Sequence, residues 1–410
     1  MRDEFERAIL AAPESIEPYA VYADWLIEQG DPRGDLISCQ LDLERTDLDR
    51  SQRAELKLRE AELLHRHSEQ WLGELAPHFA PVRPEEVDQW GMNSRPFVTH
   101  QWRRGFLDKL TIEALTVRLC HALADSRETR FVRDLHVTST AYNLGIEDDD
   151  EPARRGPRPS PRSYECEWLE LLEAPMLGNL RRFQMGDSEG DPPERGWCDN
   201  HTRVPDLEKL IGKMGQIEEL QLICKGYDAH ALFALTNLSK LRVLRMYALG
   251  EPNARGDQFE IPLGILAENR SLHELTHLQL HPHYSDDRSF IPLAQVEAVF
   301  RSTNLPELTH LQLRMSDMGD AGIEVLIRSG LLERLRSLDL RIGLVTDEGA
   351  KMLANHPPTA NLEWLDLSRN LVTKQGLEAV RKTGVRAIAE QTLTHSEVDS
   401  FQYLHEGDFE

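Results

Sequence analysis

The sequence contains little cysteine and no long apolar run. Its 410 residues include five cysteines, Cys39, Cys120, Cys166, Cys198 and Cys224, and no two of them form a C-x-x-C pair. An odd number of scattered thiols argues against a disulfide framework or a structural zinc site and favours reduced thiols in a cytosolic protein. No apolar run approaches the roughly 20 residues that span a bilayer, and the N-terminus lacks the basic start and apolar stretch of a signal peptide. We therefore expect a cytoplasmic location and no membrane partner, metal or cofactor.

Positive charge is also scarce. The 47 Lys and Arg residues are outnumbered by 70 Asp and Glu, so the formal net charge is −23. Affinity for nucleic acid depends on neutralising phosphates with Lys and Arg, and this balance therefore predicts that nucleic acid is not a partner. The phosphate-binding patterns G-x-x-x-x-G-K-[ST] and G-x-G-x-x-G are missing as well. The sequence favours a protein without catalytic residues over an enzyme.

One segment occurs twice: E-L-T-H-L-Q-L fills positions 274–280 and again positions 307–313. Both copies fit the frame L-x-x-L-x-L, which recurs along most of the chain, and the last three frames start 27 residues apart. The apolar positions of the nine frames are Leu107/Leu110/Ile112, Val132/Leu135/Val137, Leu180/Phe183/Met185, Ile217/Leu220/Leu222, Leu241/Leu244/Met246, Leu275/Leu278/Leu280, Leu308/Leu311/Leu313, Leu335/Leu338/Leu340 and Leu362/Leu365/Leu367.

This frame is the signature that the leucine-rich repeat family carries. The resemblance implies an α/β solenoid over residues 101–384, with parallel strands on the concave face and helices and loops outside. Thr346 or Asp347 can cap a helix after a repeat strand, which is similar to the ribonuclease-inhibitor-like class of these repeats. The longest spacing between frames contains an acidic block and then a basic, Pro-rich one, so we expect a disordered insertion at 145–163.

The N-terminal residues differ in character from the repeats. Apolar spacing predicts a helix near 4–12 and a second at 17–29, with a turn at 30–34 before helical spacing resumes. The run Y-A-D-W-L-I-E-Q-G-D-P-R-G-D-L-I at 22–37 resembles the bacterial repeat-companion domain, and Arg104-Gly105-Phe106 is similar to the segment with which repeats begin in that family. We expect a helical companion module at 1–45, a helical cap and connecting loop at 46–100, and a C-terminal cap with an acidic tail at 385–410.

Three segments match catalytic or metal-binding patterns. His273 and His277 satisfy H-E-x-x-H, but the repeat frame places His277 in a strand, where two histidines four residues apart lie roughly 13 Å from each other. The segment 186–190 satisfies G-x-S-x-G, yet a Pro-rich stretch follows it where a nucleophile elbow needs a helix. His281 and His283 with two nearby aspartates form a short cluster that is more often solvated than metal-bound. None of these patterns predicts an enzyme.

Candidate binding residues flank the fourth position of each frame, since side chains alternate across a strand and these neighbours face away from the core. Adjacent repeats are expected to place His277 beside His310 and Gln279 beside Gln312, which also suggests a pH-sensitive patch. Exposed aromatic and arginine residues are typical of binding hot spots. The predicted concave-face residues are Arg182, Gln184, Glu219, Gln221, Arg245, Tyr247, His277, Gln279, His310, Gln312, Arg314, Asp339, Arg341, Trp364 and Asp366.

Two functions follow from this surface. The leading hypothesis is a non-enzymatic module that binds a protein partner on the concave face and regulates an effector such as an enzyme or a protease. The alternative is a sensor of a stress-derived or foreign ligand that signals through the 145–163 loop or its cleavage, because exposed loops are preferred sites of proteolysis.

Overall fold

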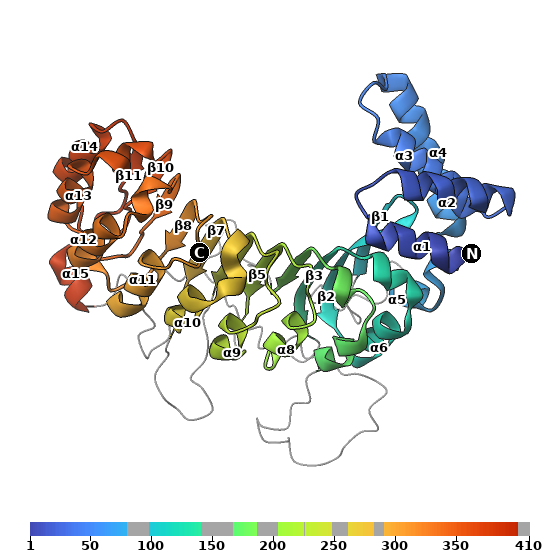
Figure 1. Cartoon of the computed structure of the whole chain (residues 1–410), viewed down its shortest axis with the longest axis horizontal. Helices are drawn as coiled ribbons and strands as arrows, with labels where there is room; N and C mark the ends of the chain where they lie inside the picture. The colour runs from blue at the N-terminus through green and yellow to red at the C-terminus, as the bar shows by residue number, and fades with distance from the viewer. Residues whose placement is uncertain are drawn as a thin grey trace, which may run out of the picture. The chain divides into compact units, whose positions relative to one another are not determined.

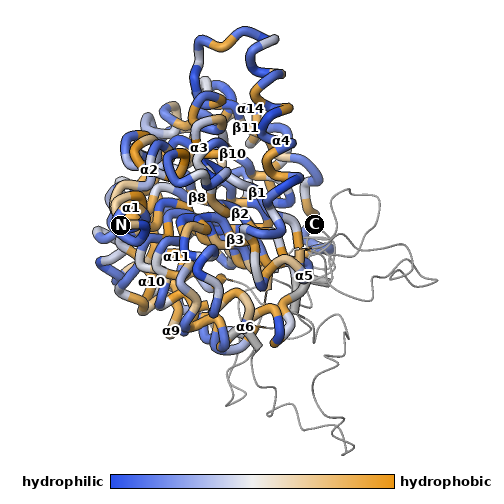
Figure 2. The backbone as a smooth tube through the Cα atoms, turned by 90° about the vertical axis from the view of Figure 1, so that its right-hand side faces the viewer, coloured by the Kyte–Doolittle hydropathy of each residue, from blue (hydrophilic) through white to orange (hydrophobic). Residues whose placement is uncertain are grey.

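The computed structural model describes residues 1–79, 98–140, 167–186, 204–224, 226–247, 261–282 and 291–400 (Figure 1). The chain divides into two compact units, Met1–Arg181 and Arg182–Glu410. The predicted insertion at 145–163 lies outside the described residues, as do most of the predicted connecting loop and the acidic tail from 401 onward. No described helix is long and apolar enough to cross a membrane, and Figure 2 shows hydrophobic and hydrophilic residues interspersed along the chain.

The first unit joins a set of helices to a small sheet. Strand β1 pairs antiparallel with β2, and β2 pairs parallel with β3. The helices are α1 (Arg2–Ala11), α2 (Glu17–Glu28), α3 (Pro32–Leu43), α4 (Arg50–Leu72), α5 (Ala76–Phe79) and α6 (Val117–Asp125), and the strands are β1 (Val98–Arg103), β2 (Phe106–Leu115) and β3 (Asp134–Thr140). The 3-10 helices are η1 (Gly73–Leu75), η3 (Arg127–Phe131), η4 (Glu167–Glu173) and η5 (Leu177–Asn179).

The N-terminal helices pack around an aromatic core. Tyr22 is fully buried and stacks between Trp25 and Phe106, with ring centroids 6.0 and 6.1 Å away. Helix α3 begins within the predicted turn, because Asp31 caps it by accepting a hydrogen bond from the Arg33 amide at 3.0 Å and Pro32 fits the first helical position. Gly34 then allows α3 to lie close to α2, since a Cβ at this residue would come within 2.7 Å of the Ala23 carbonyl oxygen.

The second unit is a run of parallel strands with helices on one side (Figure 1). Strands β4 to β11 pair in sequence order, each parallel to the next. The strands are β4 (Arg182–Met185), β5 (Glu219–Ile223), β6 (Val243–Tyr247), β7 (His277–His281), β8 (His310–Leu313), β9 (Ser337–Asp339), β10 (Trp364–Asp366) and β11 (Arg386–Ile388). The helices are α8 (Leu207–Ile211), α9 (Ala229–Phe233), α10 (Leu263–Glu268), α11 (Leu293–Phe300), α12 (Gly319–Ser329), α13 (Asp347–Ala354), α14 (Lys374–Arg381) and α15 (His395–Ser400), with η6 (Arg270–Glu274), η7 (Leu331–Glu333) and η8 (Pro357–Asn361).

The last repeats, which start 27 residues apart, share a hydrogen-bond pattern between their helices. The Asp320 carboxylate in α12 accepts hydrogen bonds from the amide and the hydroxyl of Thr346, the residue that caps α13. One repeat later, Asp347 accepts the same two bonds from Thr373, which caps α14. Each helix therefore orients the start of the next, and an acidic residue in its first turn also complements the helix dipole.

A single asparagine after strand β10 also connects two neighbouring repeats. The buried side chain of Asn370 donates to the carbonyl oxygens of Leu340, Leu367 and Ser368, and its oxygen accepts from the amides of Gly343 and Val345. The side chain thereby satisfies backbone groups of two successive turns that have no strand partner, which a buried turn requires.

All nine frames form strands, from β2 to β10, and their apolar positions are buried. The leucine-rich repeat fold with a helical N-terminal module is therefore confirmed. Strands β1 and β11 lie outside the frame, in segments for which the sequence predicts a loop and a cap.

Candidate functional site

The candidate site is the face of the second unit's sheet that lies opposite the buried frame residues, here called the open face. In register across the strands, the first row of this face consists of Arg182, Glu219, Val243, His277, His310, Ser337, Trp364 and Arg386. The second row consists of Gln184, Gln221, Arg245, Gln279, Gln312, Asp339, Asp366 and Ile388. Tyr247, Arg314 and Arg341 follow at the ends of β6, β8 and β9.

Two histidines form a stacked pair at the middle of the face. The rings of His277 and His310 lie 3.9 Å apart with an interplanar angle of 10°. Thr276 Oγ1 donates its single proton to the Arg242 carbonyl oxygen at 2.9 Å, so it accepts from His277 Nδ1 at 2.8 Å. Thr309 holds His310 in the same way, with Oγ1 at 2.9 Å from Nδ1. Both neutral rings therefore carry their proton on Nδ1 and present Nε2 as an acceptor.

The surroundings of the pair favour its neutral form. Burial, and then His310 and Arg245, lower the pKa of His277 below the usual 6.5. Burial also lowers the pKa of His310, while Glu363 raises it and Arg336 lowers it by smaller amounts. A charged ring would be poorly solvated in this partly buried position, and charging both rings would place two like charges close together. The neutral form of both imidazoles is therefore favoured at pH 7.

A cluster of arginines and aspartates lies toward the C-terminal end of the face. Asp339 and Asp366 are only 1% and 3% exposed. Asp339 accepts hydrogen bonds from Arg314 Nε at 3.2 Å and from the Arg341 guanidinium at 2.9 to 3.2 Å, and Arg341 Nε also lies 3.4 Å from Asp366 Oδ2. The two carboxylates predicted as binding residues are thus buried beneath Arg314 and Arg341, and the arginines are the more exposed members of the cluster. Their orientation is fixed by charge-assisted bonds.

Aromatic and amide side chains also lie on the strands of the open face. Gln279 donates a hydrogen bond to the hydroxyl of Tyr247 in the preceding strand, and the Tyr247 ring lies 6.0 Å from that of His281. His281 itself is buried, with 6% of its surface exposed. Trp364 is half-buried and lies directly beside the exposed Arg386.

The sequence does not predict Arg386 as a residue of this face. Strand β11 lacks the leucine frame, and the only signal for it is the apolar alternation of Val385 and Ala387, both of which are buried. Two apolar residues around one arginine are too few to predict a strand, although the arginine extends the first row of the open face by one position.

The structure does not bring together the residues of the zinc-protease pattern. His273 lies in the 3-10 helix η6 and His277 opens strand β7, so the two histidines do not share a helical face. Gly186 follows strand β4, and the rest of its G-x-S-x-G segment lies outside the described residues, as does His283. Within the ranges that the structure describes, no three His, Cys, Asp or Glu side chains are grouped so that they could hold a metal ion.

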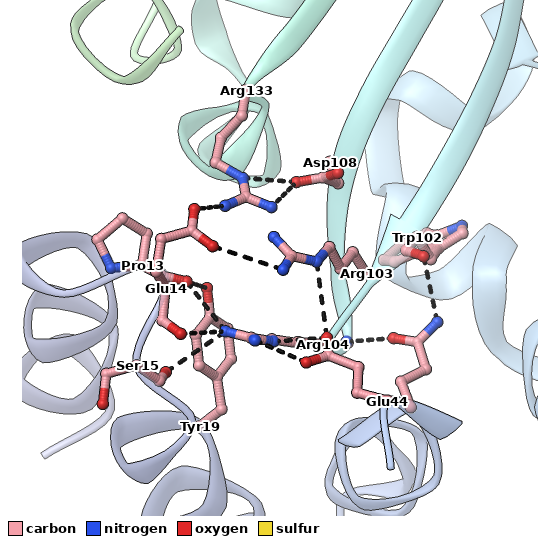
Figure 3. Close-up of polar contacts among 12 residues, drawn as sticks. Pro13, Glu14, Ser15, Tyr19, Glu44, Trp102, Arg103, Arg104, Asp108 and Arg133 are labelled. Atoms are coloured by element: carbon pink, nitrogen blue, oxygen red, sulfur yellow. Dashed lines mark hydrogen bonds and ion pairs between the residues drawn. The ribbon is translucent and has the colours of Figure 1, made fainter. Parts of the chain in front are cut away.

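The first unit contains a different set of polar contacts, centred on Arg104 in the turn between β1 and β2 (Figure 3). This side chain is 4% exposed and binds both carboxylate oxygens of Glu44, at 2.8 and 2.7 Å. It also donates to the carbonyl oxygens of Pro13, Glu14 and Ser15, and its guanidinium lies 5.0 Å from the Tyr19 ring. One arginine thereby joins three segments of the helical module to the hairpin.

Neighbouring contacts complete this junction. Gln40 accepts a hydrogen bond from the Gly105 amide at 2.6 Å and donates to the Trp102 carbonyl at 3.2 Å. Gly105 has φ of +79°, and a Cβ there would collide with Ile37. The R-G dipeptide therefore combines a buried cation with a backbone conformation that glycine favours. Arg133, which binds Glu14 at 2.6 Å and Asp108 at 2.7 Å, extends the contacts to β3.

Comparison with known proteins identifies no family. Neither a family model nor a curated protein matches the chain. Among solved structures, a protein from Bacteroides fragilis aligns with 85% of this chain and 87% of its own, at 12% identity and a TM-score of 0.45. An internalin from Listeria monocytogenes aligns with 70% and 87%, at 14% identity and a TM-score of 0.27. A leucine-rich repeat protein from Leptospira interrogans aligns with 68% and 93%, at 13% identity and a TM-score of 0.16.

Because these scores are low, the class of protein is defined by the chain's own strand register and repeat frame. The chain has a leucine-rich-repeat-like fold with a helical N-terminal module.

Proposed function

We propose that this chain is a non-enzymatic module that binds a protein partner on the open face. The observation that carries the proposal is the stacked, threonine-held His277/His310 pair, on a regular sheet that also carries Tyr247 and Trp364. Side chains on paired strands lose little further freedom on binding, and tyrosine, tryptophan and arginine dominate measured hot spots. Repeat folds of this kind generally serve as scaffolds for protein interaction. That the open face is the binding surface is our proposal.

The test is capture from native lysate with the wild type and with the variant Tyr247→Ala/Trp364→Ala, read by mass spectrometry. We expect a partner that the wild type retains and the variant loses, with each alanine costing about 1–4 kcal/mol of binding free energy. The matched control is Tyr227→Phe/Trp102→Phe. Tyr227 lies between β5 and α9 and Trp102 lies in β1, so neither belongs to the rows of the open face. A partner that the open-face variant retains as well as wild type would place binding elsewhere on the molecule.

Under this proposal, binding regulates the partner, and an effector enzyme or protease is the class expected from the sequence. The captured protein's activity, assayed with and without this chain, tests that role. The alternative function, sensing through the 145–163 loop, concerns residues outside the described part of the chain, and no observation favours it.

We further propose that residues 1–45 are a repeat-companion module whose role is to begin the repeat stack. The support for this role is the Arg104 junction, which joins the helices to the hairpin that carries the first repeat strand. Closing the open end of a repeat array protects its apolar core from solvent and from other chains.

A further inference from the structure

The open face differs in charge from the rest of the chain. It carries five arginines, Arg182, Arg245, Arg314, Arg341 and Arg386, and three carboxylates, Glu219, Asp339 and Asp366, which gives +2 for the face against −23 for the whole sequence. Two of the three carboxylates are buried beneath Arg314 and Arg341. The face therefore presents positive charge within an otherwise acidic protein.

The spacing of this charge suggests the size of what it binds. Arg245 on β6 and Arg386 on β11 are separated by five strand-to-strand steps, or about 24 Å at roughly 4.8 Å per step. An extended peptide rises about 3.3 Å per residue, so about seven or eight residues cover this distance. Between the two arginines lie the histidine pair, Gln312 and Trp364, which offer stacking and hydrogen-bonding surface. The carboxylates of these rows, Asp339 and Asp366, are buried, and the neighbouring exposed Glu363 is paired with Arg336 at 2.8 Å.

From this arrangement we infer that the open face binds an extended acidic segment of a partner protein, with carboxylates near Arg245 and Arg386 and its middle across the histidine pair and Trp364. This inference rests on the proposed function and specifies the chemistry of the partner. Arginine suits this role because its planar guanidinium binds carboxylates in pairs of hydrogen bonds.

An acidic protein segment is favoured over nucleic acid, which is also anionic. The positions of the two open-face rows include no lysine, and their arginines are spaced singly rather than as a continuous basic track. A long polyanion would also extend beyond the face and meet the acidic remainder of the chain. A short segment with a few carboxylates avoids that repulsion.

The test is fluorescence anisotropy with labelled eight-residue probes. One peptide alternates Glu with Gln, a second is all Gln, and the third probe is a single-stranded DNA octamer. We expect the full chain to bind the acidic peptide at least tenfold more tightly than either other probe, with affinity falling as salt rises from 50 to 200 mM.

The decisive variant is Arg245→Gln/Arg386→Gln, which should weaken binding of the acidic peptide at least tenfold. The matched control, Arg301→Gln/Arg328→Gln, removes two exposed arginines from the helical side and should change affinity less than twofold. Circular dichroism and urea unfolding show whether each variant folds.

Three results would overturn the inference: equal losses in both variants, equal binding of the all-Gln peptide, or no binding of the acidic peptide at about 1 mM. Tighter binding of the DNA would replace the inference with a nucleic-acid site. If a captured partner depends on Tyr247 and Trp364 while the acidic peptide fails to bind, the proposed function stands and only the acidic chemistry is wrong.

Discussion

The two units differ in which member of an arginine–carboxylate pair is buried. In the first unit, Arg104 is buried and donates its hydrogen bonds to Glu44 and to three carbonyl oxygens, all within the protein. In the second unit, Asp339 is the buried group, and the arginines that it binds are partly exposed, with 13% and 22% of their side chains accessible to solvent. A buried cation with internal partners joins segments of a fold, whereas a buried anion beneath cations orients positive charge toward solvent. A buried arginine therefore indicates a structural cluster, whereas a buried carboxylate beneath more exposed arginines indicates a candidate binding surface.

The largest effect should come from breaking the first of these clusters. We expect Arg104→Ala to lower the free energy of unfolding of the first unit by about 3–5 kcal/mol, since it leaves Glu44 without its bidentate partner and three carbonyls without a donor. Urea denaturation followed by tryptophan fluorescence measures the change, because the Trp102 carbonyl is part of this junction and Trp25 stacks on Tyr22 in the core of the same unit.

The neighbouring Arg103 is the matched control. It is 35% exposed and lies 3.5 Å from Glu14 and 3.6 Å from Glu44. Arg103→Ala should cost no more than about 1 kcal/mol, as is usual for partly exposed ion pairs. Similar losses in the two variants would mean that burial does not distinguish these arginines.

A smaller loss is expected in the second unit from Asn370→Ala. The substitution removes a buried side chain that satisfies three carbonyl and two amide groups, so we expect a loss of about 3 kcal/mol in unfolding free energy. Asn355→Ala, at an exposed position after α13, should stay within about 0.5 kcal/mol of wild type. If chemical denaturation gives Asn370→Ala the stability of the control, these backbone groups find other partners.

Much of this contrast could not be read from the sequence. The leucine frame predicts strands directly, because each apolar position reports burial and the period of two fixes which neighbours face outward. The same alternation placed Asp339 and Asp366 on the outward row without revealing that they are buried, since that depends on Arg341 crossing them from the strand end. Arg104 likewise reads as a single charge in R-G-F, and its partners Glu44 and Pro13 are 60 and 91 residues away in the chain.

The smallest expected effect concerns the histidine pair, and its sign follows from the lowered pKa values of His277 and His310. The unfolded chain takes up these protons near pH 6.5, before the folded chain does, so stability is lost as pH falls through that value toward the lower folded pKa values. His277→Gln/His310→Gln keeps hydrogen-bonding side chains at both positions but cannot titrate. We therefore expect urea unfolding at pH 7.5 and 6.0 to show a smaller loss of stability in this variant than in wild type.

His100, whose pKa is also lowered by burial, supplies the comparison in the first unit. Because it lies in β1 of the first unit and is not part of the open face, His100→Gln should reduce the pH dependence without altering binding of an acidic peptide. The histidine pair should affect both measurements: a bound carboxylate favours the protonated rings, so wild-type affinity should rise between pH 7.5 and 6.0. An affinity that is flat over this range in wild type would mean that the pair contributes to the fold of the face and not to recognition of the partner.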